Sequence, residues 1–352
     1  MFVNLRGAAD GIATLPPIGD PDYAGLRGAL AFNKGEVEVM KNEIFGFNPA
    51  LSVIRPWYSS SELLFIHAVA TPYRSRSHFD GQAILENGFA DQSRTDSGWL
   101  GRALHARDGA PPAVAIDGGI PLVLAGAKRV MNWSPGNSSV PPSDVVERLA
   151  SLYDLNPRLA PFADAMRQSA DSIERAMGAG KAKIEFFAMA ARFLLEENGP
   201  RIAVLSVDGW DTHTAQGTIK GRSQAALSKL AEGLALIRTT LGEERWARTV
   251  ILVASEFGRT ARPNGSNGTD HGTAGAVMLC GGAVNGGRVI SDWPGLAQTS
   301  LYEGRDLRPT LDMRAVFKGI LIDHLKVSHS AVERTVFPET PDVSPLGDLV
   351  KA

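Results

Sequence analysis

Residues 249–282 read TVILVASEFGRTARPNGSNGTDHGTAGAVMLCGG, with a short apolar run near each end. The first run, residues 250–254, is partly β-branched, which is typical of a strand buried on both faces of a parallel sheet. The second run, residues 276–279, has the same character. Glu256 follows the first run, and the pair Asp270–His271 precedes the second. Because open α/β sheets bind ligands beyond the ends of their strands, this stretch predicts a metal or anion site there.

The composition is that of an ordinary globular protein. The chain has 352 residues, of which 44% are hydrophobic and 21% are charged, and its formal net charge is −2. A charge this close to zero, without a basic block, argues against binding to nucleic acid. No run of 18 apolar residues predicts a membrane span, and the single cysteine, Cys280, excludes an intramolecular disulfide.

Short apolar strands alternate with helical patterns along the chain. Strands are predicted at residues 2–5, 63–69 and 201–207, and one more near 120–124. This alternation predicts an α/β fold with a largely parallel central sheet and helices on both faces. We expect a single domain over residues 1–352. The strongly helical residues 141–198 form a predicted insertion within it.

Several predicted strands end in candidate ligands. Asp10 follows the first strand, Asp208 follows the strand at 201–207, and Glu256 follows the strand at 250–254. The carboxyl ends of parallel strands meet at one edge of a sheet, so these acids should lie near one another. Asp211–His213 and Asp270–His271 stand in loops at the same predicted edge. A single Asp at a strand end, or a single His in a loop, more often has a structural role than a metal-binding one. The prediction therefore depends on the presence of several such residues at one edge of the sheet.

Ser77 is the candidate nucleophile. It precedes a helical pattern that ends at Gly88, and Arg74 and Arg76 stand just before it. The N-terminus of a helix presents free N–H groups and a positive dipole end, which suit an anion and a hydroxyl that attacks it. The alternative interpretation is that Ser77 only caps the helix and His78 packs against it.

Five segments carry a resemblance to a known family: LRGAADG (5–11), SRSHF (75–79), SVDGWDTH (206–213), SEFGRT (255–260) and GTDHG (268–272). In this order, and over nearly the whole chain, they resemble the uncharacterised DUF1501 family. That family is similar to the alkaline-phosphatase-like superfamily, which includes sulfatases and cofactor-independent phosphoglycerate mutases. The resemblance therefore implies an alkaline-phosphatase-like fold.

The resemblance also implies roles for individual residues. Asp10 would bind a metal ion, and Ser77 would attack phosphorus or sulfur. Asp211 or Asp208, with His213 and His271 and with Asp270 nearby, would form a second metal site. Arg74, Arg76 and Arg259 are candidates to hold the anion through bidentate hydrogen bonds.

One position departs from the pattern that the resemblance implies. Where an Asp–His pair is expected after the central strand, this chain has Glu256 and Phe257, and Phe257 cannot bind a metal. The site built on Asp10, Ser77 and Glu256 is then short of an imidazole, and would be weak, hold Mg²⁺, Mn²⁺ or Ca²⁺ through oxygens, or be lost. The site of Asp211, His213 and His271 has the N/O ligand set of Zn²⁺, Mn²⁺ or Fe.

These inferences predict a metal-dependent hydrolase of small phosphate or sulfate esters, with one or two divalent ions. The first alternative is a family member that binds an anion or a partner without turnover. The second is a structural protein in which these acids only form hydrogen bonds between loops. His67, inside an apolar strand, is expected to be a hydrogen-bonded core residue.

Many members of the family that this chain resembles carry a twin-arginine export signal, which implies a periplasmic or exported protein. The first residues predict a strand and not a signal peptide, so a cytoplasmic location is the alternative expectation. The oligomeric state is left open.

Overall fold

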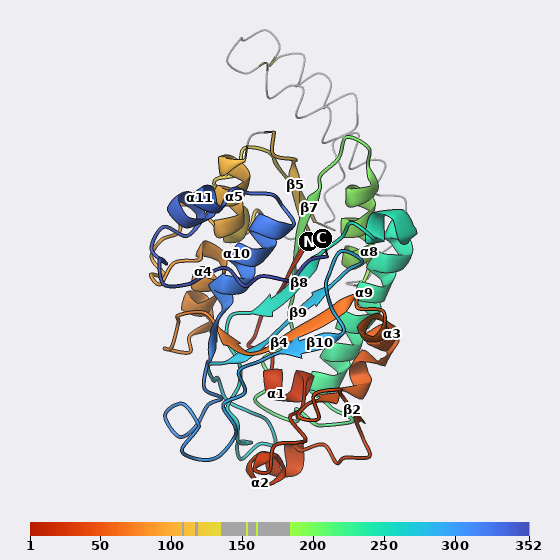
Figure 1. Ribbon diagram of the computed structural model, residues 1–352, viewed down its shortest axis with the longest axis vertical. Coiled ribbons are helices and arrows are strands. Elements are labelled where there is room, and N and C mark those ends of the chain that lie inside the picture. The colour runs from red at the N-terminus through yellow and green to blue at the C-terminus, as the bar shows by residue number, and fades with distance from the viewer. Residues whose placement is uncertain (108, 117–118, 135–152, 154–159, 161–183, 352) are drawn as a thin grey trace.

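A computed structural model describes all residues except 108, 117–118, 135–152, 154–159, 161–183 and 352 (Figure 1). Within the described residues, nine strands form one sheet, and two short strands pair separately. The strands of the large sheet are β1 (Phe2–Leu5), β4 (Leu63–Ala70), β5 (Ala113–Ile116), β6 (Val130–Trp133), β7 (Ile202–Val207), β8 (Ile251–Ser255), β9 (Gly275–Cys280), β10 (Arg288–Ile290) and β11 (Leu311–Asp312). The small antiparallel pair is β2 (Glu38–Val39) with β3 (Gly46–Phe47).

The strand order in the large sheet is β10-β4-β9-β8-β1-β7-β5-β6, with β11 beside β4. All pairs are parallel except the two that β9 makes, with β4 and with β8. The predicted α/β fold with a largely parallel sheet is therefore confirmed. The region around residues 113–133 differs from the prediction, because the strands are β5 and β6, and residues 122–124 form a 3-10 turn.

Helices cover both faces of the sheet (Figure 1). Helices α3, α8 and α9 lie on one face, and α4, α5, α10 and α11 lie on the other. The α-helices are α1 (Gly11–Thr14), α2 (Tyr23–Arg27), α3 (Arg55–Ser59), α4 (His78–Asn87), α5 (Trp99–Ala106), α8 (Glu185–Leu195), α9 (Arg222–Trp246), α10 (Met313–Asp323) and α11 (His329–Ala331). Shorter turns are η1 (Gly28–Leu30), η2 (Pro49–Ile54), η3 (Leu122–Leu124) and the π-helical η4 (Val332–Val336).

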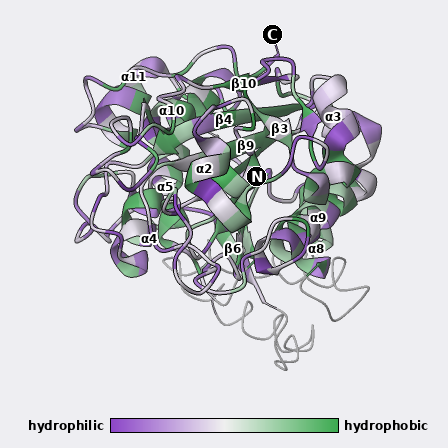
Figure 2. Ribbon diagram, turned by 90° about the horizontal axis from the view of Figure 1, so that it is seen from below, coloured by the Kyte–Doolittle hydropathy of each residue, from purple (hydrophilic) through white to green (hydrophobic). Residues whose placement is uncertain are grey.

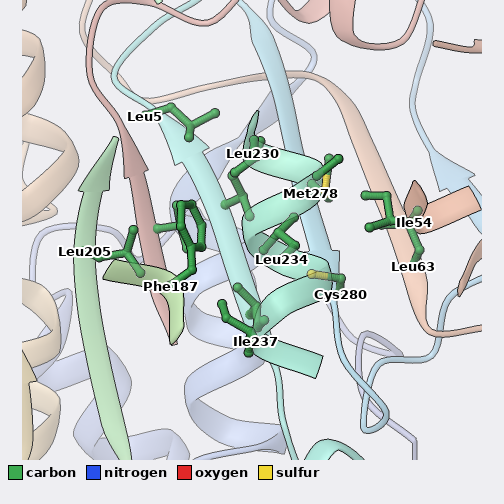
Figure 3. Packing of buried hydrophobic residues seen from close by; sticks show 14 of the residues in the cluster. Leu5, Ile54, Leu63, Phe187, Leu205, Leu230, Leu234, Ile237, Met278 and Cys280 are labelled. Atoms are coloured by element: carbon green, nitrogen blue, oxygen red, sulfur yellow. The ribbon is translucent and has the colours of Figure 1, made fainter. Parts of the chain in front are cut away.

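The alternation of side chains along each strand produces two hydrophobic cores. In β8, Ile251 and Val253 belong to the core under α8 and α9, whereas Leu252 belongs to the core on the opposite face. This is the period of two that a strand imposes, and apolar residues at successive positions bury both faces. Figure 3 shows Leu230 and Leu234 of α9 packed beside strand β9 in the first core.

Hydropathy follows the same layering. In Figure 2 the hydrophobic colour is concentrated on strands such as β4 and β9, and the surrounding loops are hydrophilic. None of the helices that the structure describes is both long and apolar enough to cross a membrane. The predicted helical insertion at 141–198 lies largely outside the described residues. Its C-terminal part contains α8, which packs its apolar face into the first core.

Candidate functional site

The register of the sheet places the predicted strand-end acids together. Strand β1 lies between β7 and β8, with Leu5 opposite both Val207 and Ser255. The loops that follow these three strands therefore leave the sheet at the same edge. Strand β9 is antiparallel to β8, so it begins at this edge, and the residues just before it, including His271, lie there too. Strand β4 is also antiparallel to β9, so it ends at this edge, and the chain continues from there into α4.

Three imidazoles and one carboxylate meet at this edge. Asp211 Oδ1 lies 3.0 Å from His213 Nε2 and 3.3 Å from His271 Nε2. The two Nε2 atoms of His213 and His271 are 3.0 Å apart. His78, the first residue of α4, brings its Nε2 atom to 3.6 Å from Asp211 Oδ1. We call His78, Asp211, His213 and His271 the histidine cluster.

The other ring nitrogen of each imidazole contacts a fixed acceptor. His213 Nδ1 is 3.1 Å from Asp270 Oδ1, and His271 Nδ1 is 2.9 Å from the carbonyl oxygen of Arg76. His78 Nδ1 is 2.8 Å from Glu256 Oε1. A neutral imidazole that donates from Nδ1 presents a lone pair on Nε2, so these contacts direct Nε2 lone pairs toward the cluster.

Arg259 fixes the carboxylate of Asp211. Its side chain is fully buried and forms an ion pair with Asp211 Oδ1. The same guanidinium donates to four carbonyl oxygens, those of Gly7, Ala8, Trp210 and Thr269. Burial would raise the pKa of Asp211, but the hydrogen bond and charge of Arg259, together with His213 and His271, lower that pKa. Arg259 thus makes all of these contacts with protein groups, and its role in holding a substrate anion stays a prediction.

Glu256 is fully buried and contacts the cluster through His78. Its Oε1 atom accepts hydrogen bonds from the backbone N–H groups of Gly7 and Ala8, in addition to its contact with His78. The hydroxyl of Ser255 donates to Oε2. Burial would raise the pKa of Glu256, but these hydrogen bonds together lower it. The hydrogen bond to Glu256 also raises the pKa of His78.

Asp10 belongs to a different set of contacts from the one predicted. Its buried carboxylate forms an ion pair with Arg27 and accepts a hydrogen bond of 2.6 Å from Gln216. Gln216 Oε1 in turn accepts from the hydroxyls of Thr212 and Thr269. Asp10 is therefore linked to the loop that carries the cluster, but its oxygens are used by the protein, and the structure does not place it among the cluster's donors.

Asp208 also lies apart from the cluster. Its side chain is exposed and lines a cavity of about 640 Å³, together with residues of β7, α8 and α9. None of the contacts described for Asp211, His213 or His271 involves Asp208. Of the predicted metal residues, the structure brings together Asp211, His213 and His271, with Asp270 and Glu256 behind them.

Ser77 occupies the N-cap position of α4 with extended backbone angles, φ −90° and ψ 129°, but its side chain makes no capping hydrogen bond. Ser77 therefore stands at the N-cap without capping through its hydroxyl, and its role as nucleophile stays a prediction. Arg76 has a left-handed backbone, φ 63°, and its guanidinium pairs with Asp306 and Glu303. Arg76 is therefore paired with two carboxylates, and its catalytic role stays a prediction.

The residues fit a divalent metal ion. Imidazole nitrogens with one carboxylate oxygen are the donor set of Zn²⁺, Mn²⁺ and Fe²⁺. Ligand atoms of His78, Asp211 and His271 all lie within 4.8 Å of one another. His78 was not among the residues predicted from the sequence. The available signal was its position beside Ser77, at the start of a helix that begins at this edge of the sheet.

A comparison with protein families gives one result that decides the relationship. The family described as "Protein of unknown function (DUF1501)" matches residues 60–336. The chain belongs to the DUF1501 family. The resemblance inferred from the five sequence segments is thereby confirmed. Among curated proteins, no relative of this DUF1501 chain is found.

Solved structures resemble this DUF1501 protein at low identity. A complex of Ps i-CgsB with a neocarrahexaose is 11% identical, with a TM-score of 0.40, over 82% of this chain and 68% of the other. The periplasmic domain of EcEptC from Escherichia coli, in complex with Zn, is 8% identical, with a TM-score of 0.37, over 80% and 72%. The phosphonate monoester hydrolase of Agrobacterium radiobacter is 12% identical, with a TM-score of 0.35, over 93% and 74%. Similarities this distant carry no argument about function.

Proposed function

We propose that this protein is a metal-dependent hydrolase of small phosphate or sulfate esters, with Ser77 as its nucleophile. The observation that carries the proposal is the meeting of Asp211, His213 and His271 at the sheet edge where α4 begins. Ser77 stands directly before His78, whose Nε2 atom is 3.6 Å from Asp211 Oδ1. A candidate cation site and a helix N-terminus thus lie next to each other.

Asp211, His213 and His271 would hold the ion. Their donor atoms are 3.0 to 3.3 Å apart. With zinc–nitrogen bonds of roughly 2.0–2.1 Å, the edge of a regular tetrahedron of ligands is about 3.3 Å. Imidazole ligands favour Zn²⁺ or Mn²⁺ over Mg²⁺ or Ca²⁺. A divalent ion bound there would neutralise charge on the ester's non-bridging oxygens and lower the pKa of a neighbouring hydroxyl.

The start of α4 supplies the place for the anion. The first N–H groups of a helix have no partner within the helix. The Ser77 side chain does not cap α4, so it does not satisfy any of them. These groups and the positive end of the helix dipole favour a tetrahedral anion next to the Ser77 hydroxyl.

The reaction follows from this placement. Ser77 Oγ loses its proton and bonds to phosphorus or sulfur, while the bond to the alcohol oxygen of the ester breaks and the alcohol leaves protonated. Water then attacks the phosphorus or sulfur of the phospho- or sulfo-seryl intermediate, the bond to Ser77 Oγ breaks, and one proton of the water passes to Ser77 Oγ as the inorganic anion is released. Arg259 acts on this site indirectly, because it holds Asp211 and the loops at Gly7 and Trp210 in position.

A protein that binds an anion without turnover is the second candidate. The observation in its favour is that the guanidinium groups of Arg76 and Arg259 are both engaged with protein groups. A hydrolase of this kind would have to hold its substrate through backbone N–H groups and the ion. A binding protein would need no further groups.

The experiment measures bound metal and turnover of aryl phosphates and aryl sulfates. Ser77→Ala should lower kcat by at least about 10²-fold while the metal content is unchanged, because the variant loses only the attacking oxygen. His213→Ala should lower both kcat and metal content. Ser75→Ala, at an exposed position in the same loop, is the control for Ser77, and His105→Ala is the control for His213.

The outcomes separate the candidates. Wild-type turnover that both variants retain would show that the assigned residues do not carry out catalysis. Bound metal and bound anion without turnover would support the second candidate. A wild-type protein that takes up no metal would contradict the metal-dependent mechanism.

A further inference from the structure

We propose that His78 is a further ligand of the metal ion, held in position by Glu256 and Phe257. This inference rests on the proposed function, because it requires an ion at Asp211, His213 and His271. It adds an imidazole from the first turn of α4. It also gives a role to Phe257, which cannot bind a metal itself.

The free nitrogen of His78 is the first observation. His78 Nε2 is buried and has no hydrogen-bond partner among the described residues. Buried polar atoms are almost always paired, so an unpaired one in a cluster of ligands calls for an explanation. The atom lies 3.6 Å from Asp211 Oδ1, which is longer than a hydrogen bond but close to the spacing of two ligands on one ion.

The orientation of the ring is the second observation. The Nδ1 atom of the ring contacts the buried carboxylate of Glu256 at 2.8 Å. On its face, the ring stacks against Phe257, with centroids 5.3 Å apart and an interplanar angle of 21°. Its ring centroid is also 4.2 Å from that of His271, in an edge-to-face arrangement. Two adjacent residues after β8 thus fix both the rotation of the ring and its tautomer.

The chemistry of this arrangement matches that of other histidine ligands in proteins. A metal-binding histidine almost always donates its second N–H to a carboxylate or a carbonyl oxygen, which fixes the tautomer and makes the ligating nitrogen more basic. His213 and His271 show the same pattern, with Asp270 and the Arg76 carbonyl as their acceptors. His78 is therefore prepared for the metal in the same way as the two histidines already assigned.

The first test is a titration of the metal-free full-length protein with Co²⁺, followed by absorption in the visible range. His78→Gln should bind Co²⁺ at least about 10-fold more weakly than wild type, because removal of even a supporting partner of a ligand has that effect. The visible spectrum should change as well, since one nitrogen donor is lost. His105→Gln, at an exposed position on α5, is the matched control and should equal wild type.

Phe257→Leu tests the role of the ring contact. It keeps all the proposed ligands but removes the stacked face, so the affinity for Co²⁺ should fall less than in His78→Gln. The spectrum at saturation should resemble that of wild type. A Phe257→Leu variant with an affinity unchanged from wild type would overturn the positioning role of Phe257.

A measurement on the wild-type protein avoids dependence on the folding of variants. With ¹⁵N-labelled histidine and bound ¹¹³Cd²⁺, scalar coupling to the metal should appear on the Nε2 atoms of His78, His213 and His271. Coupling to His213 and His271 but not to His78, with unchanged Co²⁺ binding by His78→Gln, would overturn this inference and leave the proposed function intact. Failure of the wild-type protein to bind Co²⁺ or Cd²⁺ would contradict the proposed function itself.

Discussion

Two aspartates at the same edge of the sheet have opposite surroundings. The side chain of Asp211 is 47% exposed and contacts three imidazoles and Arg259. The side chain of Asp10 is 2% exposed and is paired with Arg27, whose side chain is 1% exposed. Asp211 can therefore reach a ligand from solvent, whereas Asp10 neutralises a buried cation and accepts a hydrogen bond from Gln216.

Substitution of Asp10 tests this structural role. Asp10→Ala should reduce the free energy of unfolding by roughly 3–5 kcal/mol, because it leaves the Arg27 charge buried without its partner. Urea denaturation followed by circular dichroism gives this value. In Asp10→Ala/Arg27→Met the cation is also removed, so part of the loss should be recovered. A single variant within about 1 kcal/mol of wild type would contradict the role of the pair.

At the level of elements, the loops that leave β1, β7 and β8 approach one another closely. Gly7 has φ 118°, and a Cβ atom there would lie 2.7 Å from the backbone nitrogen of Asp211. Gly258 and Gly272 are similarly close to backbone atoms of the loop between β8 and β9. The absence of side chains at these positions allows the cluster loops to pack directly on each other.

Gly7 and Gly209 provide a matched comparison. Gly209 also has a left-handed φ, 102°, but a Cβ atom there would meet nothing within 4 Å. Both Gly7→Ala and Gly209→Ala should lose about 1–3 kcal/mol of stability from backbone strain. Only Gly7→Ala should also displace Asp211 and weaken binding of Co²⁺. Equal Co²⁺ affinities in the two variants would show that contact at Gly7 does not position the site.

At the scale of the whole molecule, the fold buries a titratable group. His67 lies in β4, is fully buried, and was predicted to be a hydrogen-bonded core residue, which the structure confirms. Its Nε2 contacts the carbonyl oxygen of Gly11 at 3.0 Å, and the N–H of Ala68 donates to Nδ1. With Nδ1 as acceptor, the ring is neutral. Burial lowers its pKa from 6.5 to about 4.

His67 should make the stability of the whole fold dependent on pH. Above pH 6.5 the imidazole of His67 is neutral in both the folded and the unfolded state. Its contribution to the free energy of unfolding is then fully present. Between pH 6.5 and 4 only the unfolded chain takes up the proton, so stability falls as the pH falls. At pH 5 the loss should be about 2 kcal/mol. In His67→Gln this part of the dependence should vanish, and urea denaturation at pH 7 and pH 5 measures it. An equal loss in both proteins would contradict the assignment.

Much of the site could be predicted from the sequence because its residues follow strands. Asp211, His213 and His271 stand next to apolar runs, and parallel strands bring their carboxyl ends to one edge. The ion-pair partner of each charged side chain could not be predicted in this way. Nothing in the order of residues indicates that Arg27 lies against Asp10, or that Arg76 lies against Asp306, since these pairs form only when distant segments pack.

The sequence by itself determined the alternation of strands and helices, the family, and the edge of the sheet at which the candidate ligands stand. These features depend on local patterns, namely apolar runs and the acids and histidines that follow them. Only the tertiary structure decided which side chains face one another. It showed His78 between Glu256 and Phe257, because ring stacking and hydrogen bonds between residues about 180 positions apart depend on backbone paths through space.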